Sequence, residues 1–250
     1  MNMKLEKIIA VRTDKTVYRD GDLAVKGFGS HYDKADILNE ALNQARVEEI
    51  GLNVPRVEEV CKIDGKWAIV SDFIPGKTLA RLMEENPDRR DEYMDLFVDL
   101  QLKMHAQTCP LLGKLKDKMN RKINETGLDA TTRYELHARL QGMPNHKKLC
   151  HGDFDPKNII LRDDGEPFIL DWAHATQGNA SADVARTYLW FCLNKLTEEA
   201  AQMMEEEVGK HGAIIGRMPL DHDLGLAGLT GTELQMTIAP VSEMAQFLIQ

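Results

Sequence analysis

Residues 149–161, LCHGDFDPKNIIL, and residues 168–172, FILDW, are the stretch of sequence that decides the fold. Asn158 follows Asp153 by five positions, and Asp171 follows Asn158 by thirteen. Apolar residues on both sides of the turn-forming Asp-Asp-Gly at 163–165 predict a short hairpin within that interval. Because a hairpin returns the chain to the edge where it started, we expect Asp153, Asn158 and Asp171 to converge at its open end.

The chemistry of these three side chains points to phosphate and metal. Carboxylate and amide oxygens suit Mg²⁺, which binds few protein groups and takes phosphate oxygens and water as its other ligands. A further carboxylate beside such a metal can accept a proton from an attacking hydroxyl. Asp163 and Asp164, in contrast, are interpreted as ordinary turn residues.

The sequence around this stretch predicts a mixed α+β protein. Strands are expected up to residue 72, with turns at Asp20-Gly21 and Asp64-Gly65, and one helix over residues 34–50. The apolar spacing within that helix predicts that Leu38, Leu42 and Ala45 face inward. Beyond residue 77 the pattern is mainly helical, and one amphipathic helix ends near His105 with the apolar positions Tyr93, Leu96, Phe97, Leu100 and Met104.

Composition excludes several classes of protein. The 250 residues carry a formal net charge of −9, which argues against a polycation that binds nucleic acid. No apolar run approaches the roughly 20 residues of a membrane-spanning helix, so no membrane partner is expected. The four cysteines show no CxxC spacing. A cytoplasmic protein is therefore expected.

HGDFDPKN together with FILDW resembles the aminoglycoside phosphotransferase and choline kinase group of kinase-like enzymes. LAVK at 23–26, DFIPGKTL at 72–79 and SADVART at 181–187 are similar to other segments of that group. The resemblance implies a two-lobed protein-kinase-like fold, with a nucleotide-binding lobe at residues 1–75 and a helical lobe at 76–250. It also implies ATP and Mg²⁺ as cofactors, with transfer of the γ-phosphoryl group to a hydroxyl of a small molecule.

The resemblance also implies roles for individual residues. Asp153 is the expected catalytic base, and Asn158 and Asp171 are the expected Mg²⁺ ligands. Lys26 is expected to bind the α- and β-phosphates, because lysine is a compact point charge. A helix glutamate should orient Lys26. The family pattern favours Glu40, whereas Glu48 lies closer to the apolar stripe and is the alternative.

The adenine ring is expected at the connector after the last strand of the first lobe. Backbone groups of Ser71, Phe73 and Ile74 would bind it, with Ile69 and Leu170 as apolar walls. His151 and Asp183 are expected to brace the catalytic loop rather than to react.

The sequence departs from protein kinases in ways that favour a small acceptor. The turn over residues 12–16, RTDKT, contains no glycine. Lys15 and the hydroxyls of Thr13 and Thr16 could contact phosphate, but a solvated turn is the preferred interpretation. Only eleven residues separate Asp171 from Asp183, which is too few for a long activation segment. An aminoglycoside, choline or similar amino alcohol is therefore expected, and an acidic protein suits a cationic acceptor. The alternatives are a catalytically silent nucleotide-binding regulator and an atypical protein-serine kinase. The acceptor, the preference for ATP or GTP and the oligomeric state have no signature in the sequence.

Overall fold

The computed structural model describes residues 7–12 and 15–193, and these form two compact units. The first unit contains the described residues up to Leu112 together with residues 148–177. The second contains residues 113–147 and the described residues from Gly178 onward. This is a different partition from the lobe boundary expected at residue 75, which stays a prediction. No helix within the described ranges combines the length and apolar character needed to cross a bilayer.

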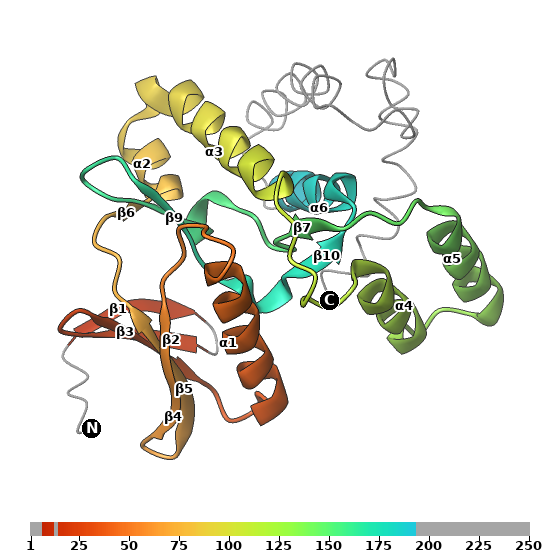
Figure 1. Cartoon of the computed structure of the whole chain (residues 1–250), viewed down its shortest axis with the longest axis horizontal. Coiled ribbons are helices and arrows are strands. Elements are labelled where there is room, and N and C mark those ends of the chain that lie inside the picture. The colour runs from red at the N-terminus through yellow and green to blue at the C-terminus, as the bar shows by residue number, and fades with distance from the viewer. Residues whose placement is uncertain (1–6, 13–14, 194–250) are drawn as a thin grey trace. The chain divides into compact units, whose positions relative to one another are not determined.

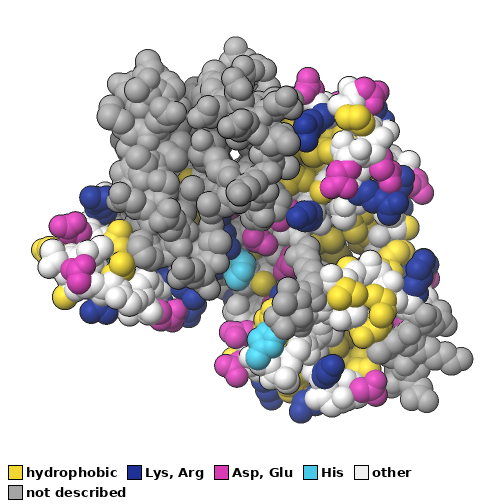
Figure 2. Space-filling model, turned by 180° about the vertical axis from the view of Figure 1, so that it is seen from behind, with side chains coloured by type: hydrophobic (Ala, Val, Ile, Leu, Met, Phe, Trp, Pro, Cys, Tyr) yellow, Lys and Arg dark blue, Asp and Glu magenta, His cyan; other side chains and the backbone are white. Residues whose placement is uncertain are grey.

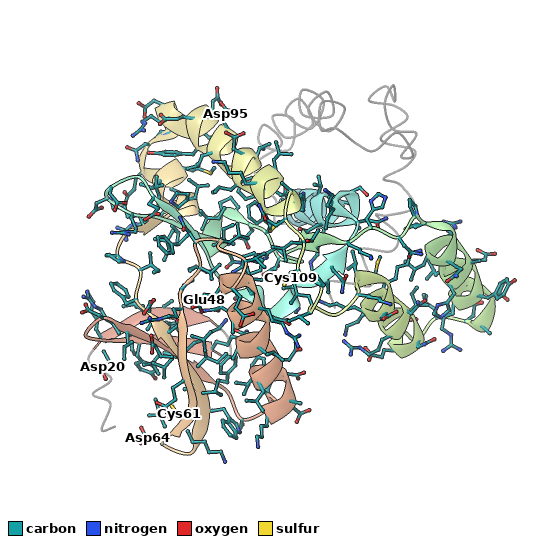
Figure 3. The ribbon with its side chains drawn as sticks, viewed as in Figure 1. Asp20, Glu48, Cys61, Asp64, Asp95 and Cys109 are labelled. Carbon is teal, nitrogen blue, oxygen red and sulfur yellow. The ribbon has the colours of Figure 1, made fainter. Side chains whose placement is uncertain are left out.

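An antiparallel five-stranded sheet with the order β1-β2-β3-β5-β4 begins the first unit (Figure 1). Tight turns join its strands where the sequence predicts them. Gly21 has a φ of 59°, and Asp64 and Gly65 have φ angles of 49° and 79°, which suits the two-residue turn of a twisted hairpin. Cys61 and Asp64 mark the β4–β5 hairpin in Figure 3. The strands are β1 (Lys7–Arg12), β2 (Lys15–Asp20), β3 (Leu23–Phe28), β4 (Val57–Ile63) and β5 (Lys66–Asp72).

Helix α1 (Lys34–Glu48) packs on one face of this sheet (Figure 1). Phe28 and Ile69 of the sheet and Ile37 and Ala41 of the helix form the core between them. The expectation that Leu38 and Leu42 face inward is wrong, because these side chains are 42% and 48% exposed. The buried face of α1 instead includes the polar residues Glu40, Asn43 and Gln44.

The rest of the first unit carries the hairpin that the sequence predicts. Of the five apolar positions expected in helix α3, Leu96 is half-buried. The other four are buried and confirm the expected inner face: Tyr93, Phe97, Leu100 and Met104. Strands β6, β8 and β9 form a small sheet, and β7 pairs with β10. The elements are β6 (Lys77–Thr78), α2 (Leu79–Glu85), η1 (Pro87–Arg89), α3 (Arg90–His105), β7 (Lys148–Cys150), η2 (Pro156–Asn158), β8 (Ile159–Leu161), β9 (Pro167–Ile169), η3 (Trp172–His174) and β10 (Thr176–Gly178).

The second unit is helical in its described part. Its helices are α4 (Leu115–Glu125), α5 (Ala130–Gly142) and α6 (Ala180–Leu193). Helices α4 and α5 bury Met119, Ile123, Leu136 and Leu140 in one apolar cluster. Asp129 caps the start of α5, because its side chain accepts hydrogen bonds from the backbone N–H groups of Thr131 and Thr132.

Candidate active site

Lys26 on β3 lies between two carboxylates that are distant in the sequence. Its Nζ donates to Glu40 Oε1 at 2.5 Å and to Asp171 Oδ1 at 3.0 Å. Burial by itself would lower the pKa of Lys26, but the charges of Asp171 and Glu40 and their hydrogen bonds outweigh it and raise the pKa above its ordinary value. The ammonium group is therefore charged at neutral pH and held in a fixed position.

The polar face of α1 explains how Glu40 reaches this position. Gln44 Nε2 donates to the carbonyl oxygen of Pro55 at 2.7 Å, and Asn43 Nδ2 donates to that of Trp172 at 3.4 Å. These bonds join α1 to the segment before β4 and to the segment that follows Asp171. Because buried amides need partners, they also set the rotation of α1 about its axis, and this rotation directs Glu40 at Lys26.

Glu48, the alternative partner for Lys26, has a different contact. It is the last residue of α1 and is labelled in Figure 3. Its Oε2 accepts a hydrogen bond from the backbone N–H of Val57 at 3.3 Å. Glu48 thus connects the end of the helix to β4, and the structure places Glu40 at Lys26.

The catalytic loop brings Asp153 and Asn158 into contact. Asn158 Nδ2 donates to the backbone oxygen of Asp153 at 2.9 Å and to its Oδ2 at 3.3 Å. The backbone oxygen of Asn158 accepts from the N–H of Leu170 at 2.7 Å. Since Asp171 follows Leu170 directly, the hairpin brings both expected metal ligands to its open end.

His151 is fully buried and bonded through both ring nitrogens. Its Nδ1 accepts from the backbone N–H of Asp153 at 3.2 Å, so Nε2 carries the proton and donates to the oxygen of Leu170 at 2.9 Å. The ring therefore connects the loop that holds Asp153 to the strand end that precedes Asp171.

Two unusual backbone conformations occur beside these contacts. Gly152 has a φ of 78°, and a Cβ atom there would lie 2.7 Å from the carbonyl oxygen of His174. Asp171 has φ and ψ of 62° although it is not glycine. Left-handed conformations cost of order 1–3 kcal/mol for most residues and are concentrated at functional sites. Asp171 thus has both the chemistry and the backbone geometry of a site residue.

The donor set at the hairpin fits Mg²⁺. Asn158 is 1% exposed, and its bonds to Asp153 orient the amide. Asp171 supplies a carboxylate whose Oδ1 also accepts from Lys26. One carboxylate and one amide oxygen are typical of a Mg²⁺ ion that completes its shell with phosphate oxygens and water.

Some backbone groups of the connector expected to bind adenine are already paired with neighbouring strands of the sheet. Ser71 is in register with Ala24 on one side and Val57 on the other. The N–H of Phe73 donates to the oxygen of Asp22 at 2.8 Å. In this connector, as far as the described residues show, Ile74 has a backbone N–H without a hydrogen bond. The expected adenine contact therefore falls most directly on Ile74.

Three further residues are expected at the site, two as apolar walls and one as a brace of the loop. Ile69 is buried in the core beneath α1, and Leu170 is half-buried next to Asp171. Asp183 is 3% exposed but belongs to the second unit, so its bracing of the loop stays a prediction. Its neighbour Lys118 has a pKa lowered to about 8, because burial and nearby cations outweigh the opposite effect of Asp183.

Sequence reasoning missed residues that shape the site through hydrogen bonds with backbone groups. Asn43 and Gln44 are the clearest, since polar residues off the apolar stripe are expected to be exposed. Asp155 is another: its Oδ1 accepts from the N–H of Lys157 at 2.5 Å and caps the short helix η2. The Asp-Pro pair at 155–156 was a usable signal, because Asp before a first-turn Pro is a common helix start.

Comparisons with known proteins identify the family and the fold of the chain. Residues 9–212 match the family APH, described as "Phosphotransferase enzyme family". No curated protein sequence matches the chain. An aminoglycoside-3'-phosphotransferase of type VIII is similar in structure with a TM-score of 0.59 at 18% identity, covering 98% of this chain and 93% of that one.

Two further solved structures are similar to the chain. APH(3'')-Id from Streptomyces rimosus has a TM-score of 0.57 at 16% identity, with 93% of this chain and 91% of that chain covered. A thermostable APH(4)-Ia variant, in a ternary complex with ADP and hygromycin B, has a TM-score of 0.60 at 13% identity, with 93% and 92% covered. These likenesses confirm the expected α+β protein-kinase-like fold.

Proposed function

We propose a reaction for this chain, which belongs to the APH phosphotransferase enzyme family. It transfers the γ-phosphoryl group of ATP to a hydroxyl of a small molecule in the presence of Mg²⁺. The observation that carries this proposal is the placement of Lys26 between Glu40 and Asp171. A charged amine held in this way next to a metal-binding carboxylate is the arrangement that phosphoryl transfer requires, because catalysis there is mostly positioning and charge neutralisation.

Each residue has a defined task in this proposal. Lys26 binds the α- and β-phosphates through its ammonium group, and Glu40 keeps that group in place. Asp153 accepts the proton of the acceptor hydroxyl as the acceptor oxygen bonds to the γ-phosphorus. The bond from that phosphorus to the oxygen bridging the β- and γ-phosphates breaks, and ADP leaves. Asn158 and Asp171 would hold Mg²⁺, which neutralises charge on the phosphates when bound.

The nucleotide base and the loop complete the arrangement. The backbone of Ile74, and the neighbouring groups of Ser71 and Phe73, would bind the adenine edge, with Ile69 and Leu170 as apolar walls. His151 braces the loop, because its ring is already bonded to both sides of the site. Asp183 is proposed as a second brace on the same loop.

A small and cationic acceptor fits the observations best. On the face shown in Figure 2, the basic and acidic side chains of the described residues are interspersed, and such a mixture offers no continuous basic surface to nucleic acid there. The similar structures include complexes with hygromycin B and with streptomycin. The free thiols of Cys61 and Cys109 suit the reducing conditions of the cytoplasm, where we place the reaction.

The test is a screen of hydroxyl compounds with purified protein, in which ADP formation is measured against ATP alone. The screen should include aminoglycosides, choline, related amino alcohols, neutral sugars and a protein-serine substrate. Acceptor-dependent ADP formation with a cationic alcohol supports the proposal. ATP binding without any turnover would indicate the silent regulator instead, and labelling of protein would indicate the protein-serine kinase.

Asp153→Asn tests the mechanism within an active preparation. We expect a loss of kcat of about 100- to 10,000-fold, the range for general acid–base catalysis, with ATP affinity within a factor of about two. Asp163→Asn is the matched control, because Asp163 is an exposed residue of the nearby turn. A variant Asp153→Asn with native turnover would remove Asp153 from the mechanism.

A further inference from the structure

Lys15 is held close to Lys26 rather than exposed in a solvated turn. Its Nζ lies 3.4 Å from Glu40 Oε2, while Lys26 is bonded to Oε1 of the same carboxylate. The side chain of Lys15 is only 18% exposed. The sequence interpretation of Lys15 as a solvated turn residue is therefore wrong.

The register of the sheet explains why the two lysines converge. Val17 on β2 lies directly opposite Lys26 on β3. Because side chains alternate along a strand, Lys15, two residues before Val17, is on the same face of the sheet as Lys26. That face is the one covered by α1, from which Glu40 projects.

Two aromatic rings lie beside the amine of Lys15. Its Nζ lies 5.2 Å from the ring centroids of both Phe28 and Tyr32. An ammonium within about 6 Å of an aromatic face is attracted to it. The rings position the amine without taking up its hydrogen-bond donors, and the contact with Glu40 at 3.4 Å is long enough for the amine to turn toward another acceptor.

We propose that Lys15 is a second phosphate-binding residue, which contacts the ATP phosphates together with Lys26. The inference rests on the proposed function, since it assigns a further contact to the same nucleotide. Lys15 and Lys26 together carry two positive charges and share the single carboxylate of Glu40, and a surplus of positive charge over this carboxylate suits an anionic phosphate group.

The glycine-free turn gives a physical reason for this residue. In protein kinases a glycine-rich loop between the first two strands covers the phosphates, and glycine lets backbone N–H groups approach closely. In this chain β1 ends at Arg12 and β2 begins at Lys15, and the turn contains no glycine. A lysine at the first position of β2 can donate to phosphate from its side chain, in place of the backbone N–H donors of such a loop.

The experiment compares the binding of ATP and of adenosine by calorimetry, using the full-length protein. Lys15→Met should weaken ATP about 10- to 100-fold, the range expected for one hydrogen bond to a charged group, and leave adenosine within about two-fold. Lys15→Arg should retain most of the ATP affinity, because it keeps the charge. Lys62→Met is the matched control, since Lys62 also lies over an aromatic ring, that of Trp67, but on β4.

A role of Lys15 confined to holding Glu40 predicts a different result. Lys15→Met would then have no further effect on ATP binding in a Glu40→Gln background, whereas a direct phosphate contact predicts a similar loss in both backgrounds. The inference is overturned by an unchanged ratio of ATP to adenosine affinity in Lys15→Met, or by the absence of any effect in the double variant. Failure of the unmodified protein to bind ATP would instead overturn the proposed function.

Discussion

Helices α1 and α3 have similar lengths, 15 and 16 residues, and belong to the same unit. Helix α3 buries Phe97 and Leu100, the residues that its apolar spacing selects. Helix α1 exposes Leu38 and Leu42 and buries Glu40 together with two amides.

The difference follows from what each helix contacts. The buried face of α3 packs on other apolar groups, such as the ring of Phe154, whose centroid lies 4.7 Å from that of Phe97. The buried face of α1 also meets Lys26 and the backbone oxygen of Trp172. Helix α3 also buries the polar residues Gln101 and His105, but the residues that its apolar spacing selects still face inward. Apolar periodicity therefore finds the inner face of α3, and it fails for α1, whose buried face contacts the charged group of Lys26.

The largest effect on stability is expected on α3. Leu100→Ala should lower the free energy of unfolding by about 2–5 kcal/mol, because Leu100 is 7% exposed and its loss leaves a cavity. Leu100→Met should cost less than about 1.5 kcal/mol, since it nearly conserves volume. Denaturant unfolding measures both changes. A decrease of less than about 1 kcal/mol in the free energy of unfolding of Leu100→Ala would show that packing of Leu100 does little to stabilise α3.

The second-largest effect is expected on the catalytic rate, when Glu40 of α1 is replaced. Glu40→Gln should lower kcat about 100-fold, equivalent to about 2.7 kcal/mol of transition-state stabilisation, because Lys26 loses one of its two negative partners. Stability should change by only about 1 kcal/mol, as an amide still fills the site and accepts a hydrogen bond.

Glu48→Gln is the control for Glu40→Gln, since it alters a glutamate of the same helix that bonds to Val57. It should leave kcat within about two-fold. An equal loss of kcat in the two variants would mean that the contact of Glu40 with Lys26 has no special importance for catalysis.

The smallest effect is expected at Leu42. Leu42→Ala should change the free energy of unfolding by at most about 0.5 kcal/mol, because the side chain is 48% exposed. It is the same substitution as Leu100→Ala on a helix of nearly equal length, so the two measurements form a direct pair. A cost near that of Leu100→Ala would show that this face of α1 is covered in solution.

Much of the fold was predictable because it depends on local chemistry. The turns at Asp20-Gly21, Asp64-Gly65 and Asp163–Gly165 occur where expected, since glycine there adopts a positive φ. The catalytic loop and its hairpin were predictable for the same reason, because the loop, both strands and the turn lie within 23 residues of continuous chain, 149–171.

The sequence by itself determined the class of fold, the hairpin and the residue types that meet at its end. Only the tertiary structure decided which glutamate faces Lys26, that Lys15 shares it, and which face of α1 is buried. Lys26 and Asp171 are separated by 145 residues, and no local pattern encodes a contact over that distance. The rotation of α1 depends on bonds from Asn43 and Gln44 to backbone oxygens elsewhere in the unit, so it is set only when those segments have come together.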